Sequence, residues 1–280
     1  MAGNFANAAD SSILKGIKSR ILSYSLQLLV LGSLGGCATS GIKPIDSYKT
    51  TITEPEIVGA YNQDAEMHMK NKEYTSAWDN YVITKNIKGL ETILDECFKD
   101  AVIHDKIIIE PINKELMAMH RELRKKKCQM EDFEKKVAHQ ARMYEDPTNS
   151  HGSLERAFIL YEVIERHSDA ERCLILWVNK DNNRYGTAKV MKYYKKFSEE
   201  AGFSNFKSEA LKITGSYLAN PTIDSCESAW IIGEAFGDME IKKKAVEAGI
   251  LHGSTSEVWN KRAFEVQEEI SQSKQQALKN

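Results

Sequence analysis

The sequence predicts an all-α protein built as an array of helical hairpins, with one long helical arm. Three observations lead to this fold class. From Glu56 onwards, apolar residues recur three and four positions apart, which is the spacing of one face of an α-helix. The 280 residues contain only five prolines, so long stretches are free to form helices. Three successive pairs of expected helices begin near residues 153, 187 and 224, a spacing typical of helical repeats.

The composition excludes some classes of protein. Hydrophobic residues make up 42% of the chain and charged residues 28%, which excludes global disorder. The formal net charge of −2 excludes a strongly basic nucleic-acid binder, so we expect no nucleic-acid partner. The length corresponds to about two domains of ~150 residues, or to one elongated array.

The first element is a segment with the layout of an export signal. Lys15, Lys18 and Arg20 precede a largely apolar run over residues 21–35, and small residues follow. This run is shorter than the ~20 residues that a membrane-spanning helix needs. The alternative is a buried amphipathic helix with an incidental cysteine.

The end of this segment, Leu34-Gly35-Gly36-Cys37, resembles the lipobox of bacterial lipoproteins. The resemblance implies that residues 1–36 are a signal peptide and that Cys37 is lipidated as the first residue of the mature chain. Ala38 in the next position implies an anchor in the outer membrane, with the protein on its periplasmic face. Residues 37–54 are then expected to be a lipidated tether.

The next region, residues 55–147, is expected to be helical and to carry the long arm. Leu90, Leu94, Cys97 and Ala101 form one apolar stripe. After Pro111 a second stripe keeps a heptad spacing to about Glu145, which predicts one long helix that pairs with the first in a hairpin. The basic run Arg124-Lys125-Lys126-Lys127 is expected to be a solvated face of that helix.

The last region, residues 148–280, is expected to consist of short paired helices. Breakers such as Gly202 and Asn220-Pro221 separate them, and Ser168–Glu171 and Ser254–Glu257 have the spacing of capping boxes. The expected helices cover residues 154–167, 169–180, 187–201, 205–219, 225–237, 239–252 and 256–277.

Two places in these regions resemble tetratricopeptide-type repeats, in which small residues lie where two helices cross and large residues fill the gaps beside them. The first match comprises Tyr61, Ala65, His68, Tyr74, Ala77 and Tyr81, and the second, poorer match comprises Trp230, Gly233, Phe236 and Ala245. Residues 88–146 depart from the pattern. The resemblance implies a solenoid whose surface binds other proteins.

Local motifs for catalysis or metal binding are absent from the sequence. It contains no HExxH, GxSxG, phosphate-loop or dinucleotide pattern. None of the seven histidines has a second histidine four residues away with which it could bind a metal on one helix face. We therefore expect no metal, no cofactor and no small-molecule substrate. The sequence leaves open whether Cys97, Cys128, Cys173 and Cys226 form disulfides or are small buried residues.

The functional hypothesis is a non-enzymatic scaffold that binds other envelope proteins, with secretion or pilus machinery as one candidate assembly. The alternative is a periplasmic hydrolase acting on cell wall, whose site is assembled from distant residues. Aromatic residues gather between residues 185 and 230 and are the candidate partner-binding face. The alternative use for most of these rings is packing in the core. The residues singled out are Tyr185, Tyr193, Tyr194, Phe203, Phe206 and Trp230.

Overall fold

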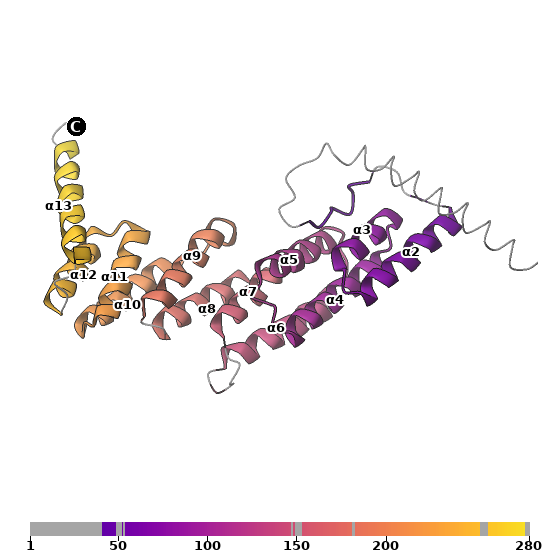
Figure 1. Cartoon of the computed structure of the whole chain (residues 1–280), viewed down its shortest axis with the longest axis horizontal. Helices are drawn as coiled ribbons and strands as arrows, with labels where there is room; N and C mark the ends of the chain where they lie inside the picture. Colours follow the sequence, from indigo (N-terminus) through magenta and orange to yellow (C-terminus); the bar gives the residue numbers. More distant parts are fainter. Residues whose placement is uncertain are drawn as a thin grey trace, which may run out of the picture. The chain divides into compact units, whose positions relative to one another are not determined.

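The computed structural model describes residues 41–48, 52, 54–146, 148, 153–180, 183–252 and 257–277. These residues form twelve α-helices and no strand (Figure 1), so the prediction of an all-α protein is confirmed. Cys37 and the expected signal peptide lie outside the described residues. The helices are α2 (Pro55–Lys70), α3 (Tyr74–Thr84), α4 (Ile87–Ile103), α5 (Glu110–Lys125), α6 (Glu131–Glu145), α7 (Leu154–Val163), α8 (His167–Lys180), α9 (Arg184–Ala201), α10 (Phe206–Ala219), α11 (Ile223–Phe236), α12 (Met239–Leu251) and α13 (Glu257–Ala277).

Most of these helices begin and end for local reasons. The side chains of Asn86, Ser153, Asn183 and Asp238 each accept a hydrogen bond from the backbone N–H three residues later, which caps the starts of α4, α7, α9 and α12. Gly202 adopts the left-handed conformation, with φ of 64°, at the end of α9. The bounds of α8 to α13 accordingly agree with the expected helices within three residues.

The expected capping box at Ser168–Glu171 is wrong. Ser168 lies inside α8 rather than before it. The buried Glu171 carboxylate instead accepts hydrogen bonds from the backbone N–H groups of Asn205 and Phe206, at 2.6 and 2.8 Å. Glu171 therefore caps the start of α10, a helix more than thirty residues further along the chain. The second expected box begins at Ser254, outside the described residues.

The single long helix expected after Pro111 is also wrong, because the chain turns between α5 and α6. Lys127 has a left-handed φ of 58°, and its N–H donates to the carbonyl of Arg124. The N–H of Cys128 donates to the carbonyl of Leu123, which completes the hydrogen-bond pattern of a Schellman motif. The basic run thus ends a helix. The heptad spacing persists because α5 and α6 both pack their apolar faces inwards.

Two compact units make up the chain, and they divide between Lys136 and Val137, within α6. The sequence alone suggests a boundary after residue 147. The N-terminal unit comprises α2 to α5 and the first part of α6, and each of α2 to α4 contacts the next helix in order. In its first hairpin, Ala65 and Ala77 are fully buried where α2 and α3 cross, with Tyr61 and Tyr81 buried beside them.

Residues 41–48, expected to be part of a tether, pack against this unit. Ile42 and Ile45 are buried. The carbonyl of Lys43 accepts a hydrogen bond from Trp78 Nε1 at 2.8 Å, and the Lys43 ammonium lies 2.6 Å from Asp79. We call residues 41–48 the strap, because they are bound to the helices through both side chains and backbone.

The C-terminal unit is a stacked array of helices. Helix α8 contacts α9 and α10, α9 contacts α11, and α10 contacts α11 and α12, so most helices here touch a second neighbour along the chain, as in an α-solenoid. The close approach of α11 and α12 requires Gly233, because a Cβ there would lie 3.1 Å from the backbone nitrogen of Lys242. Gly249 similarly lets the Trp259 ring of α13 pack directly on α12. The hairpin array predicted for this region is confirmed.

Candidate functional site

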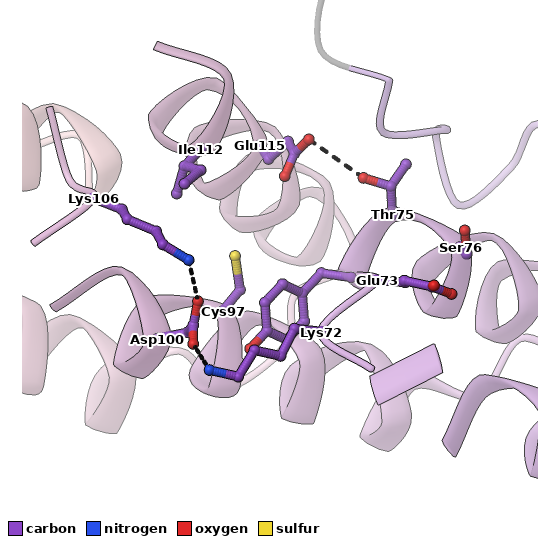
Figure 2. A pocket seen from close by; sticks show the side chains of 10 residues that line it. Lys72, Glu73, Thr75, Ser76, Cys97, Asp100, Lys106, Ile112 and Glu115 are labelled. Carbon is purple, nitrogen blue, oxygen red and sulfur yellow. Dashed lines mark hydrogen bonds and ion pairs between the residues drawn. The ribbon is translucent and has the colours of Figure 1, made fainter. Parts of the chain in front are cut away.

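A polar hollow in the N-terminal unit is a candidate site (Figure 2). Its volume is about 260 Å³, and the ends of α3, α4 and α5 and their adjoining turns form its walls. It is lined by Lys72, Glu73, Tyr74, Thr75, Ser76, Cys97, Asp100, Lys106, Ile112 and Glu115.

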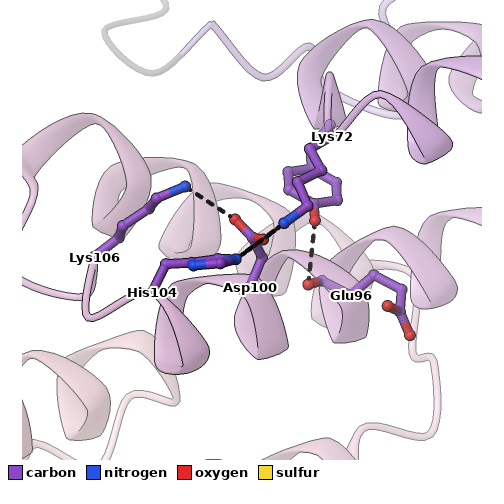
Figure 3. Close-up of polar contacts among 6 residues, drawn as sticks. Lys72, Glu96, Asp100, His104 and Lys106 are labelled. Atoms are coloured by element: carbon purple, nitrogen blue, oxygen red, sulfur yellow. Dashed lines mark hydrogen bonds and ion pairs between the residues drawn. The ribbon is translucent and has the colours of Figure 1, made fainter.

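One side of the hollow is a cluster of charges centred on Asp100 of α4 (Figure 3). The Asp100 carboxylate pairs with Lys72, lies 3.2 Å from the Lys106 ammonium and is 3.3 Å from His104 Nε2. Burial opposes the charged form of Asp100, but the hydrogen bonds from Lys72 and Lys106 outweigh it and hold its pKa below the ordinary value. One carboxylate thus joins two turns of the chain to α4.

The opposite side of the hollow is less charged. The Thr75 hydroxyl donates to Glu115 across 3.3 Å, and burial raises the pKa of the Glu115 carboxyl. Burial also raises the pKa of the Cys97 thiol to about 12, so Cys97 is protonated at neutral pH and is a poor nucleophile. The hollow therefore offers hydrogen bonds and charges for binding a small polar group, without an activated nucleophile.

Sequence analysis does not single out Lys72, Asp100 or Lys106. The one local signal is the spacing of Asp100 and His104, four residues apart on the same helix. Lys106 lies in the turn that directly follows α4, six residues after Asp100, whereas the turn that carries Lys72 is brought to α4 only by the tertiary fold.

Three of the six expected partner-binding residues do not lie on an exposed face. Phe203, Phe206 and Trp230 are buried, and Phe206 is fully enclosed between α9, α10 and α11. Its ring stacks on Tyr194 with 4.7 Å between centroids and meets Phe236 at 6.3 Å. These three rings follow the alternative, core packing, because they fill the gaps between helices.

The other three residues keep some exposure. Tyr193 and Tyr194 are half-buried, and the Tyr193 hydroxyl donates to Glu155 of α7 at 2.6 Å. Tyr185, at the start of α9, is 72% exposed. Partner binding through these side chains stays a prediction.

Tyr185 belongs to a larger exposed apolar surface of the C-terminal unit. Because α11 and α12 form a hairpin, the start of α11 and the end of α12 lie at the same end of that pair. Arg184 lies within electrostatic range of Asp224, which places the start of α9 at the same end. We call this surface the apolar edge; it comprises Tyr185, Ile223, Ile250, Leu251 and Val258, all exposed.

All four described cysteines carry free thiols, and three of them are buried. Within the described residues, no group of three His, Cys, Asp or Glu side chains is arranged to hold a metal ion. No helix in the described part of the chain has both the length and the apolar character needed to cross a membrane. Compared with protein-family models, curated proteins and solved structures, the chain matches none of them.

Proposed function

We propose that this protein is a scaffold for other proteins of a bacterial envelope assembly, with secretion or pilus machinery as the candidate. The observation that carries the proposal is the apolar edge. Leu251 is 81% exposed, and the other residues of the apolar edge are exposed at the same end of their helices, so a partner that covers this end removes apolar area from water. The stacked hairpins beneath it supply a rigid support, as in other helical-repeat scaffolds.

The proposed scaffold is a lipoprotein held at the periplasmic face of the outer membrane through Cys37. The export-signal layout and the lipobox-like sequence support this anchor. In a Cys37→Ser protein we expect incorporation of labelled lipid to stop and the chain to leave the outer-membrane fraction. N-terminal sequencing shows whether the apolar segment has been retained as a substitute anchor. Unchanged lipid labelling of the Cys37→Ser protein contradicts the proposal.

The apolar edge is tested by a photo-activated crosslinking residue at position 251 in intact envelopes. The matched control carries the same residue at Lys243, an exposed polar position on the same helix. We expect a reproducible set of envelope proteins from position 251 that is absent from position 243 and is lost in a Val258→Ser, Ile250→Ser chain. Identical products from both positions contradict the proposal. Murein cleavage by the purified protein, abolished by changing one carboxylate, would instead support the cell-wall hydrolase.

A further inference from the structure

An exposed apolar loop lies beside the polar hollow of the N-terminal unit. The loop joins α4 to α5, and its Ile103, Ile108 and Ile109 side chains are exposed, with Ile103 at 74%. Ile107 between them is fully buried, and the Lys106 N–H donates to the carbonyl of Ala101 at 2.8 Å. The loop is therefore held in place with three exposed isoleucines close together in the sequence, and a grouping of this kind can mark a surface that binds a partner or a membrane.

The strap begins at the same end of the unit as this loop. A Cβ built on Gly41 would lie 3.8 Å from the Thr75 methyl group, and Thr75 lines the hollow next to Lys72 and Tyr74. The other end of the strap lies at the far end of α5, where the Ile45 N–H donates to Glu122. The strap thus runs along the helices, and the chain enters the unit where α4 ends and α5 begins.

Cys37 is four residues before Gly41. Four extended residues span at most about 14 Å. An acyl group on Cys37 would therefore hold this end of the unit within about 14 Å of the membrane to which it is anchored. The strap cannot act as additional linker between the anchor and the unit, because Ile42 and Ile45 are buried against the helices.

We propose that the end of the N-terminal unit formed by Ile103, Ile108 and Ile109 rests on the phospholipid surface, with the isoleucines inserted among the lipid chains. This inference rests on the proposed anchor at Cys37. The neighbouring cations suit phosphate headgroups, because the ammonium groups of Lys72 and Lys106 both pair with the carboxylate of Asp100. Within residues 104–109 one acidic residue, Asp105, accompanies His104 and Lys106.

The test places tryptophan at each end of the unit in the acylated full chain. Ile108→Trp reports on the apolar loop, and Gln129→Trp, in the exposed turn between α5 and α6, is the matched control. The four natural tryptophans are buried and contribute a constant background. In vesicles of phosphatidylethanolamine and phosphatidylglycerol with brominated acyl chains, we expect several-fold stronger quenching at position 108 than at position 129. Equal quenching at the two positions overturns the proposal. Absence of quenching at position 108 also overturns it, and would be the result if the loop bound another protein instead of lipid.

A second measurement uses the unsubstituted protein. Amide hydrogen exchange over residues 103–109 is expected to slow when the acylated chain enters the vesicles, while exchange over residues 126–130 stays constant. No change over 103–109 overturns the proposal. Mass spectrometry of the N-terminal peptide tests the anchor separately, because a peptide without the mass of an acyl group shows that Cys37 is not lipidated. The tryptophan pair can then be read in a chain tethered to nickel-chelating lipid through a histidine tag at position 37, where quenching at position 108 alone still supports the contact.

Discussion

The two units solve the same packing problem with different side chains. In the C-terminal unit, aromatic rings run almost continuously between helices: Phe158 meets Tyr193 at 5.2 Å and Phe197 at 5.3 Å, and Tyr194 stacks on Phe206. In the N-terminal unit, turns and termini are joined to helices largely by charges. Asp100 collects two lysines there.

The strap shows the same preference for charge. It is bound at Asp79 through Lys43, at 2.6 Å, and at Lys126 through Asp46. The C-terminal unit also has ion pairs, such as Lys189 with Glu155, but they lie beside a core of rings. A helical hairpin requires small residues where its helices cross, but elsewhere the interface can be filled by rings or by ion pairs. Because only ion pairs are weakened by salt and by protonation, we expect the two units to respond differently to pH and salt.

The largest expected effect comes from removing a ring from the C-terminal core. Phe206→Ala should lower the free energy of unfolding by about 3–5 kcal/mol, because the cavity between α9, α10 and α11 cannot fully collapse. Urea unfolding followed by circular dichroism measures this change. Tyr185→Ala is the control, since its exposed ring should change stability by less than ~0.5 kcal/mol. Similar losses in both variants would mean that the rings do not hold this unit together.

The next largest effects are expected from adding a methyl group at one glycine in each unit. A Cβ at Gly249 would lie 2.5 Å from the Trp259 ring, so Gly249→Ala should destabilise the C-terminal unit by about 1–3 kcal/mol. A Cβ built on Gly59 of α2 would meet no atom within 4 Å. Gly59→Ala should therefore raise the free energy of unfolding by about 0.5–1 kcal/mol. Thermal unfolding of the two variants is expected to shift in opposite directions. A Gly249→Ala protein that unfolds at an unchanged or higher temperature contradicts the close packing of α12 on α13.

The smallest expected effect is electrostatic and belongs to the N-terminal unit. The pKa of Asp100 is lowered in the folded chain, so its stabilisation is complete above about pH 4 and is lost as the pH falls through the folded-state value. Asp100→Asn should therefore cost about 1 kcal/mol at pH 7. The difference from the unsubstituted protein should shrink below about pH 4 and in high salt.

Denaturant unfolding at several pH values measures the Asp100 effect. Glu240→Gln is the control, because Glu240 is largely exposed and pairs with Lys244 on a helix surface. Its substitution should change stability by less than ~0.5 kcal/mol. A cost of Asp100→Asn that is independent of pH would show that the cluster contributes packing rather than charge.

The sequence by itself determined the fold class and, within three residues, the bounds of α8 to α13. Caps such as Asn183 and breaks such as Gly202 act through hydrogen bonds and backbone angles within a few residues, so they are readable locally. The periodicity of apolar residues also marks buried faces, as the burial of Leu90, Leu94 and Cys97 shows.

Only the tertiary structure decided the partners of side chains far apart in the sequence. The same stripe of apolar residues suits one long helix or two paired helices, and contacts such as Phe98 with Phe133 distinguish the two. Glu171 has the spacing of a local cap yet binds the start of α10. Lys72 meets Asp100 from 28 residues away because the fold brings the turn after α2 beside α4. These pairings depend on which surfaces the whole fold brings together, so they cannot be predicted from the local spacing of apolar residues.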